Sequence, residues 1–220
     1  MYSFGNRKDM AIVDEPFYAY YLSQHPTVTH PGQQEILASQ STQYAQVLSE
    51  VVLGPYDKPY VFFKNMAHHL DGADWSFLEQ VQNIFLIRNP AQLIASFAQV
   101  MPSPTLLDIG LKQEYDLFQH VLSHNLSPIV IDSNKVLADP KGQLTSLCEH
   151  LGIHFDEAML EWTPGPRVED GVWAQHWYTN VHKSTGWEKQ ASSNRPFPER
   201  LRGLLDEAQV YYDKLYAYTF

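Results

Sequence analysis

Arg88 and Ser96 are spaced so that their side chains could hold one anion. Arg88 ends an apolar run, and Ser96 follows eight residues later, behind a proline at position 90 that favours a first helical turn. A guanidinium offers a planar fork of N–H donors, and a hydroxyl on the following helix adds a donor toward the same anion. The alternative is a structural salt bridge for Arg88 and a backbone hydrogen bond for Ser96.

A second group of polar residues could move a proton. His68 and His69 follow another apolar run, and an imidazole there could take the proton of an acceptor hydroxyl. The alternative for each histidine is a helix cap or a surface contact, and His69 is preferred to His68. A carboxylate of Asp14 or Glu15 could orient the acceptor or serve as the base instead. Asp14 is fully explained as the cap of a helix that starts with the next proline, so Glu15 is the better candidate.

The segment from Glu161 to Trp187 supplies two further sets of candidates. It is rich in Trp, Tyr, His and Gly with little periodicity, which is typical of an irregular loop that closes over a ligand. Its aromatic residues could line an acceptor pocket together with Asp14, or could make core packing: Trp162, Trp173, Trp177 and Tyr178. Its donor-rich turn could hold a phosphate or cap the pocket, or could be an ordinary turn: Lys183, Ser184, Thr185 and Gly186.

Metal binding is the alternative chemistry for the group formed by Cys148, His150 and His154. On a helix, the two histidines would share a face that Cys148 does not join, and Gly152 is expected to end the helix between them. The spacing matches no zinc signature. The sequence therefore predicts no bound metal.

Four short apolar runs must position these side chains, and each ends in a polar residue. The runs cover residues 11–14, 60–64, 83–88 and 128–132. Runs without alternation are typical of strands buried on both faces of a parallel sheet, with helices over both faces. Ligands of such sheets bind beyond the carboxyl ends of the strands, so we expect the four terminal residues at one edge: Asp14, Lys64, Arg88 and Asp132.

Helical patterns separate these runs. The clearest covers residues 33–53, and another begins at Pro90. A third covers residues 140–151, and a closing helix is expected over 198–216. Strands that alternate with helices predict an α/β fold.

Composition narrows the classes of function. The chain has 220 residues, 44% apolar and 18% charged, which predicts one globular domain over residues 1–220. A net charge of −10 argues against broad binding of nucleic acid. No apolar run reaches the ~20 residues that span a bilayer, one cysteine forms no internal disulfide, and the start lacks a signal-peptide pattern. We therefore expect a cytoplasmic protein with no nucleic-acid or membrane partner.

Several segments resemble, in order along the chain, a bacterial sulfotransferase-like family. They are VDEPFYAYYL at 13–22, FKNMAHHL at 63–70, FLIRNPAQLIASF at 85–97, the stretch 134–152, DGVWAQHWY at 170–178 and VHKSTGW at 181–187. The resemblance covers most of the chain. It implies a three-layer α/β fold of the P-loop type, in which helices cover both faces of a parallel sheet.

The resemblance also implies a reaction and roles for particular residues. The sulfuryl donor would be PAPS (3′-phosphoadenosine 5′-phosphosulfate), with Arg88 and Ser96 on its 3′-phosphate. Lys64 would neutralise the leaving oxygen as the S–O bond breaks, unless it is a strand-end lysine that reaches solvent. The acceptor would be a small hydroxyl or amine compound, with His69, His68 or Glu15 as base and no metal.

The sequence departs from this family at its beginning. There the family has a strand and a glycine-containing loop ending in Ser or Thr, before a helix that here stands at about residues 1–4. Such a loop aims successive backbone N–H groups at an anion, and no other segment here offers one after a strand. We therefore expect the first, central strand to be missing from this stretch. A non-catalytic nucleotide-binding or interaction module and a P-loop kinase remain alternatives, although the kinase needs a lysine in that loop.

Overall fold

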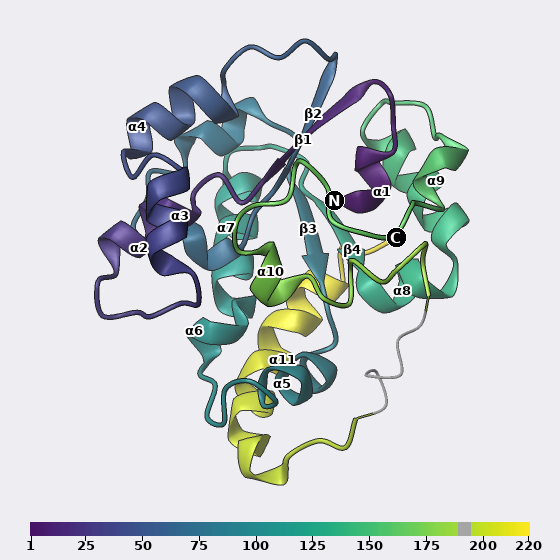
Figure 1. Cartoon of the computed structure of the whole chain (residues 1–220). Coiled ribbons are helices and arrows are strands. Elements are labelled where there is room, and N and C mark those ends of the chain that lie inside the picture. The colour runs from purple at the N-terminus through teal and green to yellow at the C-terminus, as the bar shows by residue number, and fades with distance from the viewer. Residues whose placement is uncertain (189–194) are drawn as a thin grey trace. The chain divides into compact units, whose positions relative to one another are not determined.

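Parallel strands alternate with helices along the chain, whose contacts divide it into two units (Figure 1). The computed structural model describes residues 1–188 and 195–220. The first unit comprises Met1–Ala73 and Asp156–Gly186, and the second comprises Asp74–Phe155 and Trp187–Phe220. The single domain over residues 1–220 stays a prediction.

The first unit contains strands β1 (Met10–Asp14) and β2 (Tyr60–Lys64), which pair in parallel. Their register places Asp14 directly opposite Lys64 at the carboxyl ends. The helical elements of this unit are α1 (Tyr2–Gly5), α2 (Tyr18–Gln24), α3 (Gln33–Ser39), α4 (Tyr44–Gln46), the π-helix η1 (Val47–Val52), the 3-10 helices η2 (Ala67–Leu70) and η4 (Glu157–Met159), and α10 (Ala174–Trp177).

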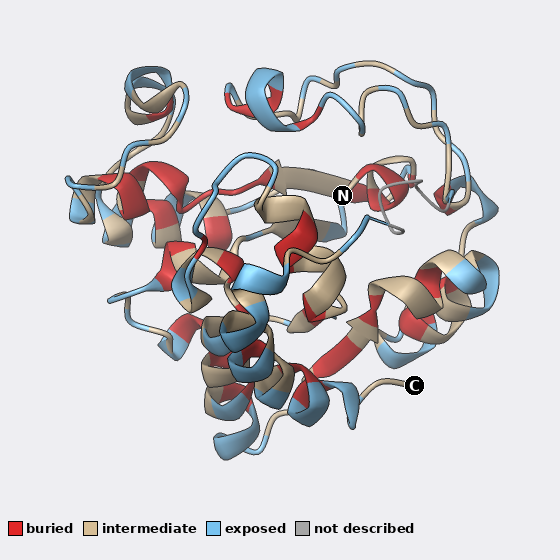
Figure 2. Cartoon of the chain, turned by 90° about the horizontal axis from the view of Figure 1, so that it is seen from below, coloured by how far each residue is buried: buried red, intermediate tan, exposed pale blue. Residues whose placement is uncertain are grey.

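The second unit contains strands β3 (Ile84–Ile87) and β4 (Ile129–Asp132), also paired in parallel, with Ile87 opposite Asp132. Its helices are η3 (Ser76–Gln80), α5 (Pro90–Phe97), α6 (Leu106–Ile109), α7 (Leu111–Ser123), α8 (Ser133–Ala138), α9 (Pro140–His150), η6 (Glu199–Leu201) and α11 (Arg202–Tyr216). Helix α11 buries Ala208, Tyr212 and Leu215, whose spacing of four and three residues marks one apolar face. Figure 2 shows such buried positions in red along the helices.

The predicted α/β class with parallel strands is confirmed, and each predicted run contains a strand. The strands form two parallel pairs, whereas we expected one four-stranded sheet. The prediction that every run is buried on both faces is wrong for β2, which is half-buried to exposed, and for Leu86 of β3, which is 58% exposed. The side chains of a strand point to the two faces of its ladder, so they are exposed wherever no other element covers that face.

One helix prediction was wrong, and one helix was missed. The long helix expected over residues 33–53 is interrupted, because α3 ends at Ser39 and Gln40 is extended, with φ −134° and ψ 157°. The Gln40 side chain instead accepts a hydrogen bond from the Ala19 amide and donates one to the Glu15 carbonyl. Helix α7 was not predicted. The helices expected at Pro90, over 140–151 and near the C-terminus are present within a few residues.

Asp132 is a structural cap in this fold, although its place at a strand end made it a site candidate. Its carboxylate accepts hydrogen bonds from the amides of Asn134 at 2.9 Å and Lys135 at 3.1 Å. It also accepts one from the Tyr212 hydroxyl at 2.9 Å, and Asp132 is 2% exposed. These bonds hold the start of α8 and join β4 to α11.

Replacing Asp132 with alanine should lower the free energy of unfolding by about 1.5–5 kcal/mol. Loss of the cap costs about 0.5–2 kcal/mol, and the stranded Tyr212 hydroxyl adds about 1–3 kcal/mol. The matched variant Tyr212→Phe keeps the helix cap but leaves one buried carboxylate oxygen of Asp132 without its donor, and should cost about 1–3 kcal/mol. Urea unfolding measures both. Equal losses in the two variants would contradict the capping role.

Candidate functional site

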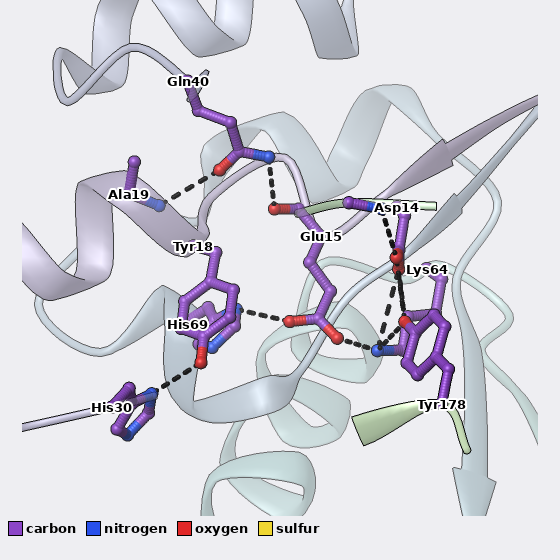
Figure 3. A network of polar contacts seen from close by, with 10 residues as sticks. Asp14, Glu15, Tyr18, Ala19, His30, Gln40, Lys64, His69 and Tyr178 are labelled. Carbon is purple, nitrogen blue, oxygen red and sulfur yellow. Dashed lines mark hydrogen bonds and ion pairs between the residues drawn. The ribbon is translucent and has the colours of Figure 1, made fainter. Parts of the chain in front are cut away.

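Polar side chains meet where β1 and β2 end, in the first unit (Figure 3). We call Asp14, Glu15, Lys64, His69 and Tyr178 the strand-end cluster. The parallel register brings Asp14 opposite Lys64, and the Glu15 amide extends the ladder by donating to the Lys64 carbonyl at 2.7 Å. His69 follows on η2, while Tyr178 comes from the end of α10. The cluster therefore joins segments that are more than 100 residues apart in sequence.

Lys64 is held within this cluster by charged and polar partners, and its role in catalysis stays a prediction. Its ammonium forms an ion pair with a carboxylate oxygen of Glu15 and lies 3.8 Å from Oδ1 of Asp14. It also donates to the Tyr178 hydroxyl at 3.1 Å. The side chains of Asp14 and Glu15 are 1% and 6% exposed, against 28% for Lys64. Two buried carboxylates thus face one lysine.

Asp14 is satisfied mainly by Tyr178. The tyrosine hydroxyl lies 2.8 Å from each oxygen of the Asp14 carboxylate, and the Gly171 amide donates to Oδ2 at 3.3 Å. These bonds connect β1 to the irregular segment that the sequence predicted over 161–187, where the only regular helix is the four-residue α10 among the described residues. Asp14 was predicted to bind substrate, and in the structure its oxygens face residues of the chain itself.

Burial shifts the titration of four members of the cluster, and it raises the pKa of Tyr178 above its ordinary value. It lowers the pKa of Lys64 to about 8, although the nearby Asp14 carboxylate opposes that shift. It raises the pKa of Asp14, again opposed by the charge of Lys64. Burial also lowers the pKa of His69 well below its ordinary value, and His68 and Lys64 add to this effect. The His69 imidazole is therefore neutral at neutral pH, which is the form that accepts a proton.

Glu15 stands between the lysine and the imidazole. One carboxylate oxygen pairs with Lys64, and the other lies 3.7 Å from Nδ1 of His69. The imidazole stacks on the Tyr18 ring, with a centroid separation of 4.3 Å. His68 packs edge-on against His69 at 4.6 Å. A carboxylate in this position can orient an imidazole whose other nitrogen takes a proton.

The backbone of Glu15 has an unusual conformation. Its φ is +42°, in the left-handed region that residues with a side chain rarely adopt. The Glu15 carbonyl accepts hydrogen bonds from the Tyr18 amide and from the Gln40 side chain, both at 3.1 Å. Strained residues of this kind persist only where their surroundings hold them, and they are frequent at functional sites.

Three of the four predicted pocket aromatics differ in exposure. Trp173 is 2% exposed and Tyr178 is 9% exposed, and both belong to the core cluster that contains Tyr18, Leu22 and Ile36. Trp177 is 46% exposed. Their role in holding an acceptor stays a prediction, and Trp177 is the member whose ring a ligand can reach.

The predicted donor-rich turn is present in the first unit. The Ser184 hydroxyl accepts from the Trp162 indole at 3.0 Å and donates to the Val181 carbonyl at 2.6 Å, so its bonding is internal. Lys183 and Thr185 are exposed. Gly186 forms an antiparallel bridge with Glu161. Only Lys183 and Thr185 present exposed side chains in this turn.

Arg88 and Ser96 belong to the second unit. Arg88 directly follows β3, and α5 begins two residues later with Asn89 as its N-cap. Both side chains are partly buried, and neither has a hydrogen-bond or carboxylate partner among the residues that the structure describes. Burial and the nearby charge of Arg195 lower the pKa of Arg88. The structural alternatives for Arg88 and Ser96 are therefore not supported by the residues described. Arg195 is an additional cation, which no periodic pattern in the sequence indicates.

Comparison with known proteins identifies a matching family and two curated relatives. A family model described as a sulfotransferase domain matches residues 1–219. Two curated relatives from Arabidopsis thaliana, branched-chain-amino-acid aminotransferase-like proteins 2 and 1, are 33% and 34% identical over 216 residues. The alignments cover 98% of this chain but only 38% and 39% of those proteins. The chain thus corresponds to about two-fifths of each relative.

A solved structure is similar in fold. The sulfotransferase domain from the Synechococcus PCC 7002 olefin synthase superposes with a TM-score of 0.53 at 16% identity, covering 89% of this chain and 74% of that domain. At that identity the similarity concerns the fold alone. In the part of the chain that the structure describes, no helix is long and apolar enough to cross a membrane.

The left-handed conformation of Glu15 predicts that glycine destabilises the protein less than alanine at this position. In a helix interior the order is the reverse. Glu15→Gly and Glu15→Ala lose the same carboxylate, but glycine tolerates φ +42°, so Glu15→Gly should be the more stable variant by at least about 0.4–1 kcal/mol. Urea unfolding measures the difference.

The control is Gln119, an exposed position inside α7. There the alanine variant should be the more stable, by about 0.5–1 kcal/mol, because glycine weakens a helix interior. The same order at both positions would show that Glu15 has no conformational strain.

Proposed function

This chain belongs to the sulfotransferase domain family, and we propose that it transfers a sulfuryl group from PAPS to a small hydroxyl or amine acceptor. The observation that carries the proposal is the state of Arg88. A partly buried guanidinium without a carboxylate partner among the described residues is costly unless an anion compensates it. A phosphate group compensates it with two parallel hydrogen bonds.

The residues of the second unit fit the 3′-phosphate of this donor. Arg88 offers a donor fork, and the Ser96 hydroxyl has no competing partner among the residues described. The charge of Arg195 is close enough to disfavour the protonated form of Arg88, and a bound dianion reverses that effect. PAPS supplies the activated sulfuryl group, and the protein's part is to hold its phosphate and position the acceptor.

The strand-end cluster is proposed to carry the transfer. The acceptor oxygen or nitrogen attacks sulfur, and the bond between sulfur and the bridging phosphate oxygen breaks with its electron pair on that oxygen. Lys64 neutralises the charge that develops there, as a preorganised cation. The acceptor proton passes to the base, which leaves a sulfated acceptor and 3′-phosphoadenosine 5′-phosphate.

His69 is the favoured base. Its imidazole is neutral because of burial, and the Glu15 carboxylate faces Nδ1, which leaves Nε2 for the acceptor proton. Glu15 itself is engaged by Lys64, so its better-supported role is to orient both groups. His68 is the second choice, since it packs against His69 and Tyr21.

The remaining assignments complete the proposal. Asp14 holds Tyr178, and with Trp173 and Trp177 these residues form the acceptor side of the site. Lys183 and Thr185 bind donor phosphate through the exposed part of their turn, with Ser184 and Gly186 shaping it. Residues 1–220 act as one cytoplasmic domain. The transfer step needs positioning and charge neutralisation and uses no metal.

The donor assignment predicts a preference for the 3′-phosphate. The chain should bind 3′-phosphoadenosine 5′-phosphate more tightly than adenosine 5′-monophosphate, by about 1.5–3 kcal/mol for the charge-assisted bonds of Arg88. Arg88→Ala should remove this preference. Calorimetry with both nucleotides measures it, and Arg202→Ala is the control, because that exposed arginine pairs with Glu199.

Equal affinity of the unmodified chain for the two nucleotides would contradict the role of Arg88. Equal loss in Arg88→Ala and Arg202→Ala would indicate a general effect of charge. A preserved preference in Arg88→Ala would place the phosphate elsewhere.

The lowered pKa of Lys64 predicts a fall in the pH–rate profile on its alkaline side, which we call the alkaline limb. Lys64 is a cation only below its pKa of about 8, so the transfer rate should fall as the pH rises through about 8. In Lys64→Arg the guanidinium stays charged, so this limb should disappear even if the maximal rate is lower. The pH dependence of kcat/KM measures the effect.

The pKa of Lys64 can also be measured directly, without an activity assay. Competitive acetylation should label Lys64 with a midpoint near pH 8, relative to the exposed lysine Lys8 of the same unit. A midpoint close to the ordinary lysine value would contradict the burial effect. An alkaline limb that persists in Lys64→Arg would assign it to another group.

A further inference from the structure

Two histidines and a glutamate converge in the second unit, on elements that the proposed transfer does not use. His120 and His124 lie one turn apart on and just after α7, and Glu79 belongs to η3. One ring nitrogen of each histidine and one carboxylate oxygen of Glu79 all lie within 4.8 Å of one another. We call these three residues the His–His–Glu cluster.

The hydrogen bonds of His124 define its tautomer. Nδ1 lies 2.8 Å from the backbone carbonyl of His120, and a carbonyl can only accept, so Nδ1 carries the hydrogen. In the neutral ring Nε2 therefore presents a lone pair, at 3.6 Å from Oε1 of Glu79. Two acceptors that face each other do not attract, and a cation between them satisfies both. Histidines that bind metals usually donate their other ring hydrogen to a carbonyl in this way.

His120 supplies an independent observation. Its Nε2 atom is buried and has no hydrogen-bond partner among the described residues. The ring packs edge-on against Trp75 with centroids 5.6 Å apart and lies 4.3 Å from the ring of His124. A proton on His124 would satisfy the contact with Glu79 but would leave this nitrogen of His120 without a partner.

We propose that the His–His–Glu cluster binds one zinc ion. Two imidazoles and a carboxylate form a common three-ligand zinc set with an open fourth position, whereas Mg²⁺ and Ca²⁺ prefer all-oxygen sites. Zinc–ligand bonds of about 2.0–2.2 Å require the ligand atoms to move slightly closer together than they are here. Glu79 and His124 are 44% and 41% exposed, so their side chains have room to make that adjustment.

Solvent can reach this cluster. Glu79 also lines a surface hollow of about 410 Å³, together with Val121 and Asn125 of the α7 end. A water or a small anion from this hollow can take the fourth position on the metal. A bound ion would connect η3 to the C-terminal turn of α7, and so would stabilise the second unit.

The absence of metal was predicted from Cys148, His150 and His154, with His176 and His182 further along the chain, and these residues do not include the His–His–Glu cluster. A pair of histidines four residues apart on a helix is a recognisable ligand spacing. Helix α7 was not predicted, so the shared face of His120 and His124 was not recognised. Glu79 could not have been found from spacing, since it lies more than 40 residues away.

Calorimetry with zinc chloride tests the proposal on the full chain, freed of any histidine tag and of metal by a chelator. We expect one equivalent of Zn²⁺ to bind and no binding of Mg²⁺. The variant His124→Asn should lose more than the ~10- to 100-fold that removal of an outer-shell partner costs. Glu79→Gln should also weaken binding. His154→Asn, an exposed histidine in the same unit, should bind like the unmodified chain.

Two further measurements guard the interpretation. Zinc should raise the unfolding temperature of the unmodified chain and of His154→Asn, but not of His124→Asn. Cobalt substitution should give the intense visible absorption of a tetrahedral site, and this absorption should vanish in His124→Asn. Circular dichroism checks that each variant folds. If His124→Asn does not fold, Glu79→Gln is used in its place for the same measurements.

Three results would overturn the proposal. The first is the absence of saturable zinc binding. The second is binding that is the same in His124→Asn, Glu79→Gln and His154→Asn, because the metal would then occupy other histidines. The third is binding without any rise in unfolding temperature in the unmodified chain.

Discussion

A lysine ammonium that is removed from water needs a compensating charge, and in the first unit this requirement determines how several segments are held. Lys64 is paired with Glu15 and lies near Asp14, and both carboxylates are almost fully buried. Taking each ion out of water costs several kcal/mol, which the pair recovers only if its geometry is good and its remaining hydrogen bonds are made. Tyr178 and Gly171 supply those bonds to Asp14. The loop that carries them is thereby tied to the strands.

The same pairing accounts for irregular features nearby. Glu15 faces Lys64 while its backbone has φ +42°. Its carbonyl accepts a hydrogen bond from the side chain of Gln40, which is extended and directly follows the end of α3 at Ser39. Behind Glu15, the Tyr18 ring stacks on His69 and enters the core cluster with Trp173. Through these contacts, the ion pair at the two strand ends is connected to the end of α3 and to the apolar core.

The sequence predicted those features that depend on local chemistry. Continuous apolar runs identified the strands, Pro90 marked the start of α5, and the polar residues at strand ends brought Asp14, Lys64 and Glu15 under consideration together. The break at Gln40 and the conformation of Glu15 depend on contacts made by distant residues, so no local pattern signals them. Asp132 has the same position in its strand as Lys64 but serves as a helix cap, because Tyr212 from α11 occupies its remaining oxygen. Position at a strand end thus identifies candidates but does not separate a site residue from a cap.

The two strand-end cations differ in a way that suits the proposed reaction. Arg88 has no carboxylate partner among the described residues, so its charge is available to a phosphate that stays bound throughout the transfer. Lys64 already has a partner in Glu15, and an additional anion of constant charge gains little from it. When the bridging oxygen gains charge during transfer, it competes better with Glu15 for the same ammonium. An interaction that strengthens only as charge develops lowers the activation barrier without making the substrate bind more tightly in the ground state. The pairing that compensates Lys64 in the resting protein would therefore direct its effect to the transition state.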